Sequence, residues 1–187
     1  MNDNQNIIEH TRRWIAAIVV GLNLCPFARR VFDGEKVRYV VSAAQNDAAL
    51  LKDLTDELQW LAAAPMSNIE TTLLIHPHAL DDFLDYNDFL DVAESRIEEL
   101  DLSGVIQLAS FHPQYQFADT NPDAVENYTN RSPYPMLHLL REESISAIAD
   151  DPDELLEIPR RNIETLTALG REKILALLNE IAATHDS

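Results

Sequence analysis

The chain has 187 residues, of which 46% are hydrophobic and 25% charged. That is the composition of a globular protein long enough to bury a core without disulfides or structural metals. Its 14 basic and 32 acidic side chains give a formal charge of −18. A field of this sign repels phosphate backbones and anionic lipid headgroups, so the composition argues against nucleic acid and against membrane surfaces as partners.

The N-terminal segment and the residue usage point to the cytoplasm. The apolar run from Trp14 to Leu22 is shorter than the ~20 residues that a membrane helix needs, and no signal-peptide cleavage pattern follows it. The single cysteine, Cys25, cannot form an internal disulfide, which suits a reducing compartment. The four glycines are isolated, so neither a P-loop nor a Rossmann fingerprint is present, and we predict no cofactor.

The first half of the chain alternates between helical and strand patterns. A helix is predicted from about Gln5 to Gly21, followed by a short β-branched strand that begins at Arg38. Asn46 or Asp47 can cap the next helix, and a second strand begins at Thr71. The inner positions expected for the first two helices are Ile8, Trp14, Ile15 and Ile18, then Leu50, Leu51, Leu54, Leu58 and Leu61.

A long acidic helix and a third strand follow. The apolar stripe expected for this helix is Phe83, Tyr86, Leu90, Ala93, Ile97 and Leu100. Its acidic residues resemble a calcium loop only superficially, because the glycine on which an EF-hand loop turns is absent; a solvated helix face is the better interpretation. The third strand, VIQLASF, comes directly after Gly104.

Helices are predicted for the rest of the chain. One is expected near Pro135 and Met136, a short one after Asp151-Pro152, and a last one from about Pro159 towards Thr184. Strand, helix, strand, helix, strand is typical of a parallel sheet with crossover helices. We therefore predict one α/β domain over residues 1–187. It would have a small parallel-type sheet of about three strands in βαβαβ order, an N-terminal helix and a helical C-terminal cover.

Two histidine-proline pairs close successive predicted strands, His76-Pro77 and His112-Pro113. If these strands are parallel, both imidazoles emerge at the carboxyl edge of the sheet, where open α/β proteins usually bind ligands. The alternative is that each histidine only caps its strand by bonding to a loop carbonyl. We take His76 and His112 as candidate catalytic residues, with His112 as general base.

Cys25 is the third candidate catalytic residue. Pro26 suits the first turn of a short helix, which would place Cys25 at the N-cap, with Arg29 one turn on. The positive end of a helix and a nearby guanidinium both favour the thiolate, the reactive form of cysteine. The alternative is an inert thiol buried among apolar neighbours.

A proline-rich segment, NRSPYP, precedes the predicted helix from Met136 to Glu142. On that helix His138 and Arg141 would share a face, and Glu142 could orient the imidazole. Guanidinium groups pair with carboxylates and phosphates in bidentate geometry, so the segment suggests a small anionic ligand. Each arginine could instead be an internal counter-ion. The predicted substrate-binding residues are Asn130, Arg131, Ser132, Tyr134, His138 and Arg141.

A metal site is less well supported. His76, His78, His112 and His138 could supply imidazoles, and Asp81 or Asp82 a carboxylate. No HExxH or paired-cysteine spacing is present, so we predict no metal.

Five segments together, GLNLCPFA, TTLLIHP, DFLDYNDFLD, QLASFHPQYQFA and NYTNRSPYPMLHLLRE, resemble the bacterial family known as domain of unknown function 1415. The resemblance extends from about Thr11 to Gly170. It implies that Cys25 and the candidate histidines lie in the signature segments of the family, but it implies no activity.

Three functional hypotheses follow. The first is an enzyme that acts on a small anionic metabolite in a pocket formed by cysteine, histidine and arginine at the carboxyl edge of the sheet. The second is a metal-dependent hydrolase that uses His76, His112 and His138. The third is a non-catalytic domain that binds a metabolite or has a regulatory role. Nothing in the sequence indicates an oligomeric state.

Overall fold

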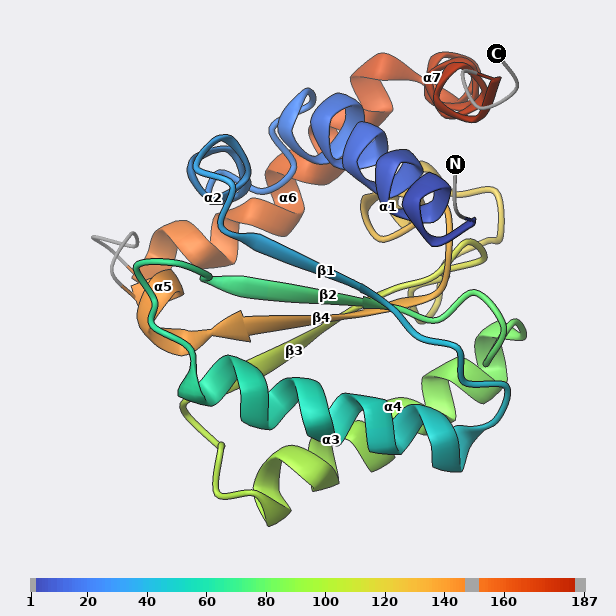
Figure 1. Ribbon diagram of the computed structural model, residues 1–187. Coiled ribbons are helices and arrows are strands. Elements are labelled where there is room, and N and C mark those ends of the chain that lie inside the picture. Colours follow the sequence, from blue (N-terminus) through green and yellow to red (C-terminus); the bar gives the residue numbers. More distant parts are fainter. Residues whose placement is uncertain (1–2, 147–151, 184–187) are drawn as a thin grey trace.

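The protein is built around one mixed β-sheet with helices on both faces (Figure 1). The computed structural model describes residues 3–146 and 152–183, with only the backbone of residues 152–155. The sheet has four strands in the order β1-β2-β4-β3. These strands are β1 (Val37–Val41), β2 (Thr71–Ile75), β3 (Ile106–Phe111) and β4 (Met136–Arg141).

The three predicted strands are confirmed, but the sheet is not a parallel sheet of three. β1 pairs with β2 in parallel, and β4 lies between β2 and β3, antiparallel to both. The helix predicted from Met136 is therefore wrong, because these residues form a central strand. Leu137 and Leu139 are buried on one face and Met136 on the other. A strand buried on both faces lacks the apolar-polar alternation that would have revealed it.

The face of the sheet that we call the α4 face is covered by α3 (Asp47–Ala63) and α4 (Phe83–Glu99). The predicted cap is confirmed: the side chain of Asn46 accepts a hydrogen bond from the backbone N–H of Ala49. Asp82 caps α4 in the same way. Side chains of both helices that are at most 3% exposed form the core: Leu50, Leu54, Leu58, Leu61, Tyr86, Phe89, Ala93 and Ile97.

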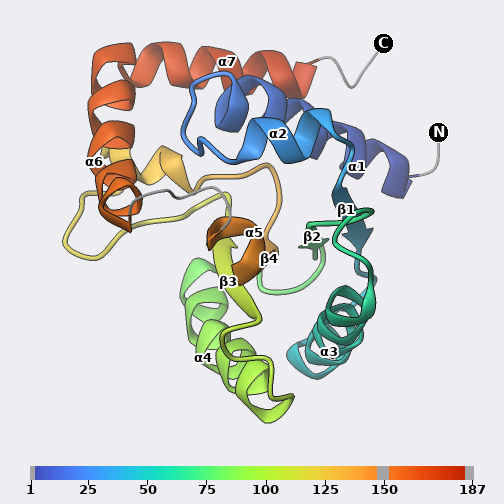
Figure 2. The ribbon, with the colours of Figure 1, turned by 90° about the vertical axis from the view of Figure 1, so that its left-hand side faces the viewer.

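The opposite face, the α1 face, is covered by the N-terminal and C-terminal helices (Figure 2). They are α1 (Asp3–Trp14), its π-helical continuation η1 (Ile15–Val20), α2 (Ala28–Asp33), α6 (Pro152–Leu169) and α7 (Arg171–Ala183). Two short helices, η2 (Val125–Thr129) and α5 (Glu142–Ser146), flank β4 in the chain.

The boundary between the two C-terminal helices differs from the prediction. α6 continues through Pro159, where a new helix was expected, and the break comes at Gly170. The φ of Gly170 is +80°, a conformation that side chains with a Cβ rarely adopt. Thr184 and Asp151, at which helix ends were predicted, lie outside the described residues. Within the described chain no helix has both the length and the apolar character required to span a membrane.

Candidate functional site

His76 and His112 follow β2 and β3 directly, at the carboxyl ends of these strands, as predicted. Both rings lie against Tyr86 of α4, with centroid separations of 5.8 Å for His76 and 5.0 Å for His112. Both residues are fully buried. The two histidines therefore form an aromatic cluster with Tyr86 on the α4 face.

Both ring nitrogens of His112 have backbone partners. Its Nδ1 accepts a hydrogen bond from the backbone N–H of Gln114 at 3.0 Å, so the ring proton is on Nε2, which donates to the Leu80 carbonyl at 3.1 Å. A general base needs a free lone pair within reach of its substrate. In this conformation His112 offers none.

His76 also bonds to the loop after β2. Its Nδ1 donates to the Ala79 carbonyl at 2.9 Å, while its Nε2 is buried without a partner among the described residues. Burial lowers the pKa of His76 to about 4. Together with His112, whose pKa is also lowered by burial, it fixes the backbone of Ala79 and Leu80.

The proline-rich segment is held by its own polar side chains. Arg131 donates to the carbonyls of Tyr115 at 3.1 Å and Pro122 at 2.6 Å, and its guanidinium lies 4.6 Å from the ring centroid of Tyr128. The amide of Asn130 donates to the Ser110 carbonyl at 2.9 Å. These contacts fold the loop between β3 and β4 onto itself.

Three more of the predicted substrate-binding residues, Ser132, Tyr134 and Arg141, also have partners within the protein. The Ser132 hydroxyl donates to the Tyr134 carbonyl at 2.6 Å, and the hydroxyl of Tyr134 lies 3.1 Å from Nδ1 of His10. Arg141 donates to the carbonyls of Leu61, Ala64 and Ile69, at the C-terminal end of α3 and beyond it. The two arginines expected to clamp an anion thus bind backbone carbonyls in different parts of the molecule.

His138 lies on the α1 face, whereas Arg141, three residues on in the same strand, reaches the C-terminal end of α3 on the other face. The predicted shared face does not exist, because the segment is a strand. Nε2 of His138 donates to the Thr71 hydroxyl at 2.7 Å, and that hydroxyl donates to the Leu139 carbonyl at 2.6 Å. Burial lowers the pKa of His138 to about 4. Glu142 begins α5 and does not orient this ring.

Cys25 lies near the other edge of the sheet. It precedes α2, and Arg30 of α2 pairs with Glu70, the residue just before β2, at the amino edge. Burial raises the pKa of the thiol and outweighs the hydrogen bonds from the backbone N–H groups of Phe27 and Ala28, which lower it. Arg29 donates to the Val20 carbonyl at 3.3 Å. The neighbouring Leu24 is buried in the core of the α1 face, whereas His76 and His112 contact Tyr86 on the α4 face, so the chain at Cys25 and the two histidines belong to opposite faces of the sheet.

The histidines of the metal hypothesis are also divided between the two faces. His76 and His112 contact Tyr86 on the α4 face, and His138 is on the α1 face. Among the residues that the structure describes, no group of three His, Cys, Asp or Glu side chains is placed to hold a metal ion.

The carboxyl edge of β1 and β2 does contain a groove, which encloses about 990 Å³. Three segments form it: the residues that lead into α3, the loop after β2, and the first half of α4. Its polar lining residues are Gln45, Asn46, Asp47, His78, Asp81, Asp82, Asp85 and Asp88. Its apolar lining residues are Ala48, Leu51, Ala79, Leu80, Phe89 and Val92.

This groove, which we call the acidic groove, is lined by five carboxylates and by no lysine or arginine of the described part of the chain. His76 and His112 take part indirectly, because they bond to the carbonyls of Ala79 and Leu80 in one of its walls. From the sequence we predicted a solvated helix face for the acidic residues of α4, several of which line this groove. The sequence did contain a signal for the groove, which is the position of its residues: Gln45 to Ala48 follow the first strand, and His78 to Asp82 follow the second.

The fold and the site define a mixed α/β protein with helices on both faces of one sheet and an acidic groove at the carboxyl edge of its parallel strands. The chain belongs to the family described as "Protein of unknown function (DUF1415)", whose family model matches residues 6–176. A search of curated proteins found no match. A search of solved structures found none either.

Proposed function

We propose that this protein binds a small, positively charged organic molecule, such as an amine, in the acidic groove. The observation that carries the proposal is the lining: five carboxylates and, among the described residues, no lysine or arginine line a groove of about 990 Å³. A cleft lined by charges of one sign raises the local concentration of ligands of the opposite sign. The formal charge of −18 on the whole chain acts in the same direction.

The shape and position of the groove support a molecular ligand over a diffuse ion atmosphere. The groove lies at the carboxyl ends of two parallel strands, where α/β folds commonly bind ligands. Leu51, Phe89 and Val92 supply apolar surface beside the carboxylates. Ligand sites usually combine such surface with a few polar groups that set the orientation of the ligand.

The predicted enzyme with Cys25, His112 and Arg131 at one pocket has less support. The chain at Cys25 packs on the α1 face, where Leu24 is buried, whereas His112 contacts Tyr86 on the α4 face. The imidazole nitrogens of His112 are both bonded, and Arg131 binds carbonyls. The hypothesis of a metabolite-binding domain agrees better with this arrangement, although the charge of the groove favours a cation over the predicted anion.

A set of four-carbon probes tests the proposal. Putrescine, 1,4-butanediol and succinate have similar lengths but carry positive, zero and negative charge. We expect only putrescine to produce saturable backbone amide shifts at the residues of the groove in NMR spectra recorded at low salt. Added salt should weaken the binding, since exposed charges are screened within about 8 Å at physiological ionic strength.

Paired variants separate the groove from the general charge of the protein. Asp85→Asn with Asp88→Asn removes two carboxylates of the groove. Asp91→Asn with Glu98→Gln removes two exposed carboxylates of the same helix outside it. We expect the first pair to weaken putrescine binding about five- to thirtyfold, at roughly 0.5–1 kcal/mol for each of the two exposed ion pairs. Equal losses in both pairs, or equal shifts with all three probes, would contradict the proposal.

A further inference from the structure

Arg12 is unusual among the arginines of the described residues. Every other arginine that is buried or half-buried has a carboxylate or carbonyl partner, whereas the guanidinium of Arg12 has no hydrogen-bond acceptor among them. Those partnered arginines are Arg13, Arg38, Arg96, Arg131 and Arg141. In a chain with 32 acidic residues, a half-buried guanidinium with no carboxylate bound to it calls for an explanation.

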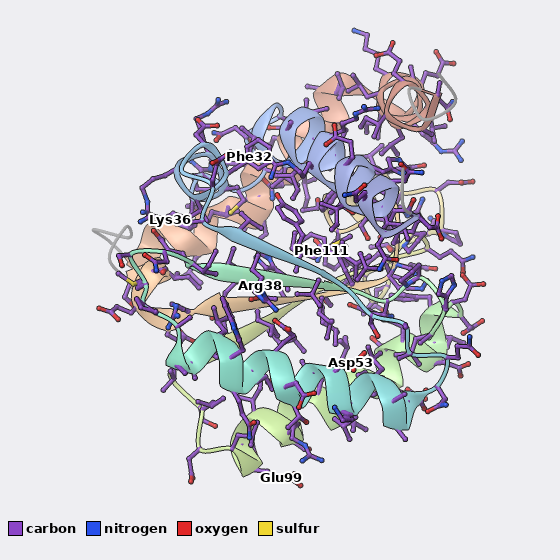
Figure 3. All side chains as sticks on the ribbon, in the orientation of Figure 1. Phe32, Lys36, Arg38, Asp53, Glu99 and Phe111 are labelled. Carbon is purple, nitrogen blue, oxygen red and sulfur yellow. The ribbon has the colours of Figure 1, made fainter. Side chains whose placement is uncertain are left out.

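Two aromatic rings hold the Arg12 side chain at the corner where α1, α2 and β1 meet. The central carbon of its guanidinium lies 5.6 Å from the ring centroid of Phe32 and 5.4 Å from that of Tyr39. Figure 3 shows Phe32 on α2, above the start of β1. Cation–π contacts of this kind fix the group through its face. The N–H groups at its edge remain available for bidentate bonds to an oxyanion.

The hydroxyl of Tyr39 is a second donor without an acceptor. Its oxygen is buried and has no hydrogen-bond partner among the described residues. Burial raises the pKa of Tyr39 to about 12, and the nearby charge of Arg12 only partly opposes this. The hydroxyl is therefore a neutral donor in the ordinary pH range. The charge of Glu9 also raises the pKa of Tyr39, and this carboxylate is bonded to Arg13 at 3.0 Å.

We propose that Arg12 and Tyr39 form an anion-binding site that takes the carboxylate or phosphate group of a small molecule. The oxyanion would accept hydrogen bonds from the edge of the Arg12 guanidinium. The Tyr39 hydroxyl is buried and has no partner among the described residues, so it would join the site after the Arg12 side chain gives up its contacts with the two rings. Such an acceptor would satisfy both donors at once.

This site is independent of the acidic groove. Arg12 and Tyr39 lie on the α1 face, and the groove is formed by α3, α4 and the loops that lead into them. No residue is common to the two sites, so either proposal can fail without the other.

The test compares two oxyanions with chloride at constant ionic strength. Inorganic phosphate and acetate are titrated separately, and the Nε–H signal of Arg12 is followed by NMR after assignment with Arg12→Lys. We expect a saturable shift with at least one oxyanion and none with chloride; the oxyanion that binds more tightly identifies the group. Arg12→Lys keeps the charge but loses the bidentate edge, and should weaken binding at least about tenfold.

Tyr39→Phe distinguishes a binding role from a packing role. Removal of a buried hydroxyl without a partner should raise the urea midpoint of the free protein and, at the same time, weaken the binding of the oxyanion several-fold. Arg13→Lys, on the same helix, is the matched control and should leave binding unchanged. The proposal is overturned if neither oxyanion produces a saturable shift, or if Arg12→Lys binds as tightly as the wild type. It is also overturned if Tyr39→Phe lowers the midpoint while the affinity stays the same.

Discussion

Acidification should destabilise this protein between pH 6.5 and pH 4 through its buried histidines. In the unfolded chain a histidine binds a proton below its ordinary pKa of about 6.5. In the folded protein burial lowers the pKa of His76 and of His138 to about 4. The unfolded state therefore binds more protons throughout this window, so stability is complete above pH 6.5 and is lost as the pH falls towards 4.

The magnitude follows from the two pKa values. For fully buried His76, lowering the pH from 7 to 4.5 should reduce the free energy of unfolding by about 2 kcal/mol. The loss is steepest below pH 6, where it approaches about 1.4 kcal/mol per pH unit. His138 is half-buried, so its contribution has the same sign but should be smaller.

Urea unfolding at a series of pH values measures this slope. His76→Gln loses the packing and the bond to the Ala79 carbonyl, so it should be less stable than the wild type at pH 7. Between pH 5 and pH 6, however, its slope should be lower by about 1 kcal/mol per pH unit. His78→Gln, which alters an exposed imidazole two residues away, is the matched control for the substitution itself. The reasoning is refuted if His76→Gln keeps the wild-type slope, or if NMR titration of the folded protein gives His76 a pKa near 6.5.

Three further predictions concern single side chains. Glu70→Gln should lower the free energy of unfolding at pH 7 by about 1–3 kcal/mol in urea titrations, because the 2%-exposed carboxylate of Glu70 pairs with Arg30 and Lys36. Since these partners hold its pKa at about 2, the stabilisation should be present above pH 4.5 and disappear as the pH falls to 2. The prediction is wrong if the variant loses as much stability between pH 4.5 and pH 2 as the wild type does. Arg141→Met should lower the thermal midpoint by several degrees, because about 2–3 kcal/mol is lost when backbone carbonyls are left without a donor; a midpoint equal to that of the wild type would show that water replaces the guanidinium. Cys25 should react with iodoacetamide at pH 7.4 more slowly than glutathione does, because burial raises its pKa, and a faster reaction would indicate a thiolate.

Local patterns in the sequence were sufficient for much of the fold. Asn46 follows the first strand and has the side chain of an N-cap, and the leucines behind it repeat at helical spacing; both features are seen in α3. β4 could not be predicted in this way. Its residues, MLHLLR, include no β-branched side chain, and its two buried faces remove the alternation on which strand prediction depends.

The places of the two histidine-proline pairs in the sheet were predictable, but the partners of their side chains were not. Both pairs follow strands that run antiparallel to β4, so they lie at the same edge of the sheet, and that inference needs only the direction of the two strands. The partners of the side chains depend on tertiary contacts. Arg141 bonds to carbonyls 80 and 77 residues away in the chain, and Arg131 to carbonyls 16 and 9 residues away. Backbone carbonyls are present at every position, so no sequence motif marks an arginine that binds them.

The insertion of β4 between β2 and β3 has a consequence for biosynthesis. β1 and β2 can pair as soon as both have left the ribosome, but β3 has β4 as its sheet neighbour and must wait for residues 136–141. A nascent chain that stops before this point carries a strand whose backbone donors and acceptors lack partners, which favours association with other chains. Completion of the sheet should therefore be a late event in synthesis, and release of shortened products should be a source of aggregation.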